Sequence, residues 1–85
     1  MYEVIIEGKA KKQIEKLSGV TLKQIDKALA GLESNPRHSK VEKLTGYNLW
    51  RIRAGDYRII FEVNDTHKKV IVYKIKHKRE IYRNL

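Results

Sequence analysis

The sequence predicts an α+β domain in which an N-terminal helical hairpin packs on a small, mainly antiparallel sheet. Two patterns predict this fold. Between residues 9 and 34, apolar residues recur every three or four positions, as they do on one face of a helix. From residue 47 onward, β-branched and aromatic residues alternate with polar ones, which is typical of half-buried strands. The predicted order is therefore β-α-α-β-β-β, followed by a short C-terminal helical turn.

The first two elements come from the N-terminal segment. Residues Tyr2–Ile6 alternate and are rich in β-branched side chains, so we expect a strand there. From Lys9 to Leu17, the residues Ala10, Ile14 and Leu17 have the i, i+4, i+7 spacing of one helical face. Lysines cover the opposite face of this first helix, which suggests that it lies on the surface of the domain.

A second helix is expected after a break at Ser18-Gly19. The segment from Thr21 to Gln24 has the form of a capping box, so we expect the helix to begin there. Asn35-Pro36 ends it, because a proline cannot continue a helix. Its apolar stripe consists of Leu22, Ile25, Ala28, Leu29 and Leu32.

Three further strands are expected over Tyr47–Arg53, Tyr57–Val63 and Lys69–Lys76. The segments between them, 54–56 and 64–68, contain the Gly, Asn and Asp residues of tight turns, which indicates an antiparallel meander. A short helical turn is expected around 79–82. Strand alternation assigns two sets of side chains to the face that packs on the helices: Tyr57, Ile59, Phe61 and Val63 in the second strand, and Ile71, Tyr73 and Ile75 in the third.

Length and composition favour one small intracellular domain. The 85 residues contain no repeat and no linker, so we expect a single domain over residues 1–85. There is no cysteine, which fits a reducing compartment. No apolar run approaches the ~20 residues of a membrane-spanning helix, and the first residues do not resemble a secretory signal. We therefore expect a soluble, cytoplasmic protein without a membrane partner.

The charge of the chain suggests a polyanionic partner. Nineteen Lys and Arg against 10 Asp and Glu give a formal net charge of +9. Residues 1–46 hold 9 basic and 6 acidic side chains, whereas residues 47–85 hold 10 and 4. The electropositive face is thus expected in the C-terminal half. The alternative is a lysine-rich surface that only keeps the protein in solution.

The positions of the basic residues favour phosphate binding. Alternation places Arg51 and Arg53 on one face of their strand, and Arg58 begins the next strand just across a short turn. Further cations, at positions 76, 78 and 79, end the last strand and follow it. Guanidinium groups gathered in this way can each donate two parallel hydrogen bonds to a phosphate.

Three aromatic residues accompany these charges and offer surfaces on which RNA bases can stack. Trp50 and Tyr57 lie in strand patterns, where a place in the core is the more common role. Tyr82 lies in a polar tail and has less core to join, so it is the better stacking candidate.

Two segments resemble the RelE/ParE superfamily of toxins from type II toxin–antitoxin pairs. They are Leu49–Val63, which reads LWRIRAGDYRIIFEV, and Ile75–Arg83, which reads IKHKREIYR. Lys43-Leu44-Thr45-Gly46 and the helical hairpin also fit, so the resemblance covers nearly the whole chain. It implies the RelE-like fold and, for the RelE branch, an endoribonuclease that cuts mRNA on the ribosome without a metal or another cofactor. In that reaction the 2′-hydroxyl attacks the adjacent phosphate.

The resemblance also implies residue roles. Arg58 matches the arginine that stabilises the scissile phosphate, and Arg79 matches the one assigned to the leaving group. Arg51 stands where RelE has its lysine base, and Leu49 replaces a second lysine; a guanidinium remains protonated, so Arg51 suits phosphate binding better than proton transfer. Tyr82 matches the stacking tyrosine, although it lies closer to Arg79. The remaining expected RNA contacts are Arg53, Lys76 and Lys78.

The group that accepts the 2′-hydroxyl proton remains open, with two candidates. Glu42 precedes the first meander strand, where some relatives carry a Glu or His base. His77 lies beside Arg79, and histidine is the side chain whose charge changes most readily near neutral pH. The three histidines, at positions 38, 67 and 77, are far apart in sequence and no cysteine exists, so no metal site is expected.

The resemblance leaves three functions to compare. The first is the ribosome-dependent mRNA endonuclease, with the ribosome and mRNA as partners. The second is a ParE-like inhibitor of DNA gyrase, which shares the fold but performs no RNA chemistry. The third is a catalytically weakened, toxin-like RNA-binding protein, suggested by the changes at Leu49 and Arg51. All three imply a cognate acidic, RelB-like antitoxin that neutralises the basic face.

Overall fold

The computed structural model describes residues 1–83, with side chains as far as Glu80. It confirms the expected α+β fold. No helix within residues 1–83 is long and apolar enough to cross a membrane. The elements are β1 (Glu3–Ile6), α1 (Gly8–Glu15), α2 (Gly19–Ser34), β2 (Val41–Lys43), β3 (Trp50–Ala54), β4 (Tyr57–Asn64), β5 (Lys69–His77) and α3 (Lys78–Arg83).

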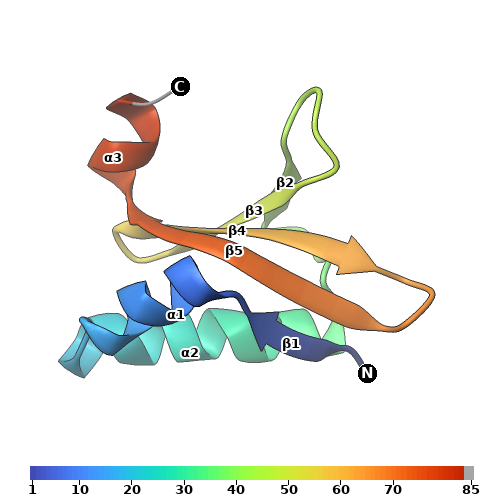
Figure 1. Ribbon diagram of the computed structural model, residues 1–85, viewed down its shortest axis with the longest axis horizontal. Helices are drawn as coiled ribbons and strands as arrows, with labels where there is room; N and C mark the ends of the chain where they lie inside the picture. Colours follow the sequence, from blue (N-terminus) through green and yellow to red (C-terminus); the bar gives the residue numbers. More distant parts are fainter. Residues whose placement is uncertain (84–85) are drawn as a thin grey trace.

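One five-stranded sheet in the order β1-β5-β4-β3-β2 organises the molecule. β1 pairs with β5 in parallel, and the other neighbours are antiparallel. The pairs β3–β4 and β4–β5 are those of the predicted meander. The helices α1 and α2 lie against one face, which we call the inner face (Figure 1). The segment between β2 and β3 and the helix α3 rise on the other side, so the outer face lies between them.

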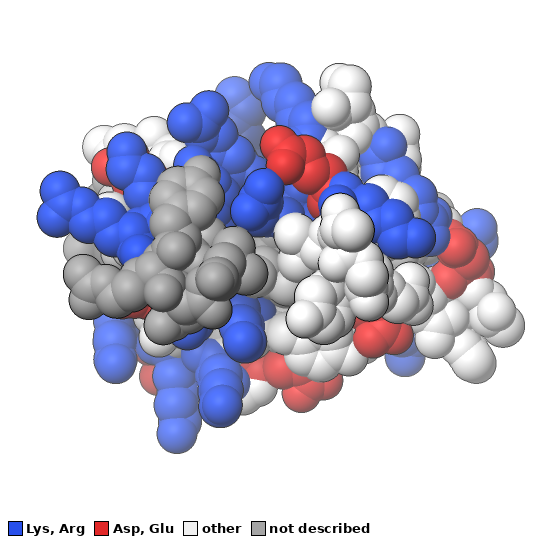
Figure 2. All heavy atoms as spheres, turned by 90° about the horizontal axis from the view of Figure 1, so that it is seen from above, with Lys and Arg blue, Asp and Glu red and all other residues white. Residues whose placement is uncertain are grey.

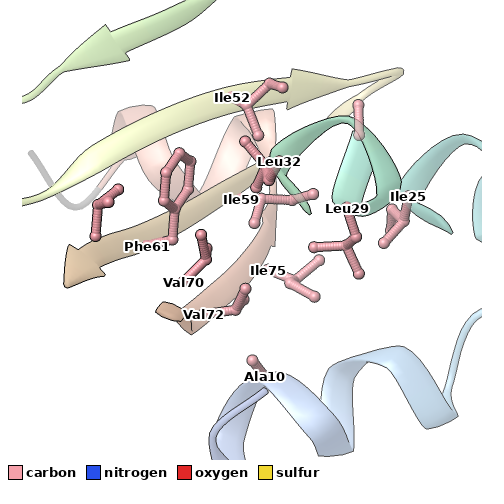
Figure 3. Packing of buried hydrophobic residues seen from close by; sticks show 12 residues of the cluster. Ala10, Ile25, Leu29, Leu32, Ile52, Ile59, Phe61, Val70, Val72 and Ile75 are labelled. Carbon is pink, nitrogen blue, oxygen red and sulfur yellow. The ribbon is translucent and has the colours of Figure 1, made fainter. Parts of the chain in front are cut away.

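The hydrophobic core lies between the inner face and the two N-terminal helices (Figure 3). Ile59 and Phe61 of β4 are fully buried against Ile25 and Leu32 of α2, and Ala10 connects α1 to the same cluster. The β4 residues expected to point inward thus do so. Every second residue of this central strand is used for packing, which leaves the alternate positions for the outer face.

Two boundaries near β2 differ from the prediction. The segment between residues 37 and 46 contains the additional strand β2, and the first meander strand begins at Trp50 instead of Tyr47. Residues between the two strands form a turn in which the Leu44 N–H donates to the Leu49 carbonyl at 3.0 Å. A strand of three residues is too short to produce a recognisable alternation, so the sequence carried no clear signal for it.

The prediction that a capping box at Thr21 starts the second helix is wrong, because α2 begins two residues before Thr21. Ser18 is the N-cap residue, and its side chain makes no capping hydrogen bond. Gly19 follows it with a φ of 59°, a conformation that a glycine adopts without a steric penalty. The chain therefore turns from α1 into α2 in fewer residues than a cap at Thr21 requires.

A β-bulge in β5 corrects the expected inward face of that strand. Phe61 pairs with Val72 while Ile60 pairs with Lys74, so Tyr73 is an extra residue without a direct partner. Val70 and Val72 point inward before the bulge and Ile75 after it, whereas Ile71 is only partly buried. Tyr73 is 37% exposed, and its hydroxyl donates to Glu62 Oε1 at 2.8 Å, which raises the tyrosine pKa.

An ion cluster ties the N-terminus to the turn between β4 and β5. Arg37 donates two hydrogen bonds to the Asp65 carboxylate, at 2.9 and 2.8 Å, and the Tyr2 hydroxyl donates a third at 2.6 Å. The Arg37 bonds, followed by that of Tyr2, lower the pKa of Asp65 from its ordinary value of 3.8 to about 2. The ionised carboxylate therefore stabilises the folded state.

This shift predicts a specific loss of stability in acid. Because the pKa is lower in the folded state, the contribution of Asp65 is present above pH 3.8 and is lost as the pH falls toward about 2. We expect the wild type to lose more unfolding free energy than Asp65→Asn between pH ~5 and ~2.5, measured by urea denaturation. Asp26→Asn, an exposed carboxylate on α2, is the control. Equal behaviour of the two variants would contradict a role for the cluster.

Candidate nucleic-acid interface

The outer face of the sheet gathers basic side chains. Figure 2 looks onto this face from above and shows Lys and Arg side chains over it and around its rim, with few acidic side chains among them. The positions that alternation turns outward on β3 are Arg51 and Arg53, while those on β5 after the bulge are Lys74 and Lys76. The strands thus separate a core on one face from charge on the other.

Three cations form a cross-strand row at the centre of this surface. Arg58 of β4 is paired with Arg53 of β3 on one side and with Lys76 of β5 on the other. We call these three residues the cationic row. Directly opposite residues have Cβ atoms about 4.5–5.5 Å apart. A phosphate above the row can therefore be contacted from three strands at once.

A tight turn fixes the two arginines of the row. Ala54 pairs with Tyr57, so only Gly55 and Asp56 connect β3 to β4. Gly55 has a φ of 59° and Asp56 has no positive φ, the pattern of a type II′ hairpin turn with glycine at its first central position. The short turn fixes the register of β3 against β4, so Arg53 and Arg58 remain opposite each other.

Arg58 is the only buried charged side chain among the described residues, with 5% of its surface exposed. Its Nη1 donates to the carbonyls of Gly55 at 3.2 Å and Tyr57 at 3.0 Å. Within the described residues, no carboxylate lies at ion-pair distance from it. The neighbouring carbonyls orient the guanidinium without neutralising it, so its charge remains available for an anion.

A hollow of about 170 Å³ opens beside the row, lined by Lys40, Glu42, Arg51, Arg53 and Arg58. Glu42 is the one acidic group in this lining. Arg51 donates to its Oε2 at 2.8 Å across the β2–β3 pair, and this hydrogen bond, together with the charge of Arg51, lowers the pKa of Glu42. The carboxylate is thus ionised at neutral pH and accepts one of the hydrogen bonds that the Arg51 guanidinium can donate.

The structure separates the two candidate bases. Glu42 lies at the hollow, but His77 is paired with Tyr57 and shares the inner side with Ile75. The rings of His77 and Tyr57 meet edge to face with centroids 5.4 Å apart, and His77 Nδ1 accepts a hydrogen bond from the Arg79 N–H at 3.2 Å. His77 is therefore on the opposite side of β5 from the row.

The other expected residues occupy the start of α3 and its surroundings. Lys78 Nζ lies 3.5 Å from Asp56 Oδ1, and both side chains are substantially exposed. Arg79 is exposed in the first turn of α3, and α3 rises on the outer side of the sheet (Figure 1). The backbone of Tyr82 belongs to α3, but its side chain lies outside the described residues.

The two strand aromatics have the core role expected for them. Trp50 and Tyr57 are partly buried against the hydrophobic cluster. Two cations lie near the Trp50 ring, with Arg37 Cζ 5.2 Å and Lys43 Nζ 5.6 Å from its centroid. Neither ring is placed on the cationic row, so they contribute to the site by supporting the strands.

This arrangement can bind and stabilise a phosphate with converging cations. Sequence reasoning missed Lys40, because it precedes the short strand β2 that the sequence did not reveal. Among residues 1–83, no group of three or more His, Asp or Glu side chains comes together in a way that could hold a metal ion.

Comparison with known proteins identifies the family. The model of the family described as "ParE toxin of type II toxin-antitoxin system, parDE" matches residues 4–82. The chain belongs to the RelE/ParE superfamily of toxins. No curated protein matches it by sequence.

Solved structures of RelE/ParE toxins are similar over nearly the whole chain. The archaeal RelE–RelB complex from Pyrococcus horikoshii contains a chain that is 30% identical, with 91% of this chain and 94% of that chain covered and a TM-score of 0.80. The intact E. coli RelBE complex gives 26% identity, coverage of 91% and 96%, and a TM-score of 0.79. Isolated E. coli RelE, at 23% identity, full coverage of both chains and a TM-score of 0.80, shares the fold.

The cationic row of this RelE/ParE toxin should reduce its stability at low salt. Like charges directly opposite in a sheet are destabilising, and salt screens them. We expect Arg53→Gln to raise the free energy of unfolding by about 0.2–1 kcal/mol at low ionic strength, with a smaller gain at high salt. Urea denaturation across a salt series measures this. A stability change that is independent of salt would contradict repulsion within the row.

Proposed function

We propose that this toxin is a ribosome-dependent mRNA endonuclease. The observation that carries the proposal is the buried guanidinium of Arg58 between Arg53 and Lys76, with no carboxylate of the described residues at ion-pair distance. Burying a charge without an ion-pair partner costs stability, whereas an RNA phosphate would neutralise it. The 30% identity to an archaeal RelE adds support.

The proposed reaction is an internal transfer at one phosphate. The 2′-oxygen forms a bond to the adjacent phosphorus as its proton leaves, and the bond from phosphorus to the 5′-oxygen breaks as that oxygen gains a proton. The products are a 2′,3′-cyclic phosphate and a 5′-hydroxyl. Arg58 stabilises the charge that develops on the phosphate oxygens, with Arg51 and Arg53 beside it, and Arg79 acts on the leaving oxygen.

Glu42 is our choice for the group that accepts the 2′-hydroxyl proton. It lies on the same face as the row and lines the hollow, whereas His77 shares the inner side with Tyr57. Arg51 keeps Glu42 ionised, which is the form that can accept a proton, although the lowered pKa makes it a weak base. A phosphate bound by Arg51 would compete for its charge and strengthen that base.

Three further residues complete the proposed site. Lys76 contacts the RNA as a member of the row, and Lys78 can exchange its exposed Asp56 partner for a phosphate. Tyr82 stacks on a base, as the resemblance to RelE implies. Its contribution rests on that resemblance alone.

A RelB-like antitoxin is the proposed protein partner. The similar structures from P. horikoshii and E. coli are complexes of RelE with RelB. The net charge of +9 favours an acidic partner that covers the outer face. Under this proposal, expression of the toxin alone arrests growth, and co-expression of the antitoxin restores it.

Removing the central arginine should abolish cleavage. We expect Arg58→Gln to slow cleavage of ribosome-bound mRNA by about 10²–10³-fold, because one preorganised donor to the developing charge is lost. Arg79→Ala should also impair it strongly. Primer extension on mRNA after induced expression reports both the extent and the position of cleavage, and circular dichroism checks that each variant folds. Lys23→Gln, on the exposed side of α2, is the control. Full activity in both arginine variants would refute the proposal.

The pH dependence of cleavage separates the two candidate bases. If Glu42 is the base, its lowered pKa keeps it ionised well below pH 7, so the rate should not fall between pH ~8 and ~5.5. A histidine base would instead lose activity as the pH falls through about 6.5. Single-turnover rates of Glu42→Gln and His77→Gln complete the comparison. A fully active Glu42→Gln variant would exclude Glu42.

Gyrase inhibition is the second candidate, because the matching family model is described as ParE toxin. A supercoiling assay with purified toxin tests it directly. Loss of gyrase activity while ribosome-bound mRNA remains intact would favour this function over RNA cleavage.

A further inference from the structure

A second cationic groove lies along the edge of β5. β1 pairs with β5 only from Lys69 to Val72, so beyond Val72 this edge faces α1 and not another strand. Figure 1 shows α1 beneath the part of β5 that leads into α3. The residues that line the groove are Lys9, Lys12, Gln13, Lys16, Lys74, Ile75 and Lys76.

The lysines of the groove come from two elements that converge. Lys9 and Lys12 of α1 and Lys16, its C-cap residue, follow one another at helical spacing and are exposed. Lys74 and Lys76 are turned outward by the bulge at Tyr73. No acidic residue lines the groove, and none of these lysines forms an ion pair within the described part of the chain.

The groove is continuous with the cationic row, because Lys76 belongs to both. A strand of RNA whose phosphate lies over Arg58 can therefore continue past Lys76, around the edge of β5, and reach the lysines of α1.

The lining of the groove favours a phosphate backbone over an acidic protein segment. A peptide that binds in a groove usually needs apolar anchors. The only apolar residue in this lining is Ile75, which is fully buried in the core. Lysines are flexible point charges that contact phosphates without strict geometry. Protection of a free strand edge explains lysines on β5, but not the three contributed by α1 and its C-cap residue.

We infer that this groove binds the RNA backbone outside the nucleotides that react, and so extends the footprint of the same strand. The inference rests on the proposed function, which makes RNA the substrate. It also adds a length requirement, because an RNA that fills only the cationic row cannot reach α1.

Binding of RNAs of two lengths tests the inference. The probes are a trinucleotide and a dodecanucleotide of 2′-O-methyl RNA, which lack the attacking hydroxyl and cannot be cut. For Lys9→Gln/Lys12→Gln, we expect the dodecanucleotide to bind roughly twentyfold more weakly at ~0.1 M salt, with the salt slope reduced by about 1.4. The trinucleotide should bind as it does to the wild type. Fluorescence anisotropy across a salt series gives both quantities.

The control is Lys11→Gln/Lys23→Gln, which removes the same charge from exposed helical positions outside the groove. Equal losses for the two double variants, or equal losses for both RNA lengths, would overturn the inference, because the lysines would then act only through net charge. Unchanged RNA binding with weaker binding of a glutamate-rich peptide would overturn it in favour of a protein partner.

The outcomes also separate this inference from the proposed function. If the wild type leaves ribosome-bound mRNA intact but Lys9→Gln/Lys12→Gln shows the length-dependent loss of binding, cleavage is refuted and the groove stands. If the wild type cuts mRNA but Lys9→Gln/Lys12→Gln binds both RNAs normally, only the groove is refuted.

Discussion

The register of β4 between β3 and β5 is the constraint on which the rest of the structure depends. Because successive side chains point to opposite faces, one register places Ile59 and Phe61 in the core and Arg58 on the outer face. A shift of one residue would exchange these faces. The two-residue turn at Gly55 prevents such a shift between β3 and β4. Hydrophobic packing thus determines where the charges stand.

The parts of the fold that could be predicted are those with a regular period. The helical spacing of residues 9–34 and the alternation in β4 revealed two helices and the central strand. The bulge at Tyr73 could not be predicted, because the phase of β5 changes only through its pairing with β4. The helix start at Gly19 was equally hidden, since it depends on how closely α2 must follow α1.

Much of the candidate site followed from the same alternation. The proximity of Arg53 and Arg58 required only a strand pattern on each side of a short turn. The inward position of His77 could also have been predicted, because it lies two residues after Ile75. The place of Lys40 in the site could not be predicted, since Lys40 lies in a segment without a regular alternation of apolar and polar residues. Nor did the sequence show that Arg51 is held by Glu42, a contact that requires the pairing of β2 with β3.

The extra residue at Tyr73 gives one strand two different halves. Before it, Val70 and Val72 are buried in the core. After it, Lys74 and Lys76 face solvent instead of the interior. Deleting one residue here would direct two ammonium groups into an apolar space and draw Ile75 out of it. Substitutions on this surface can therefore change its affinity for an anion in small steps. A change in the length of β5 would instead disrupt the packing of the core.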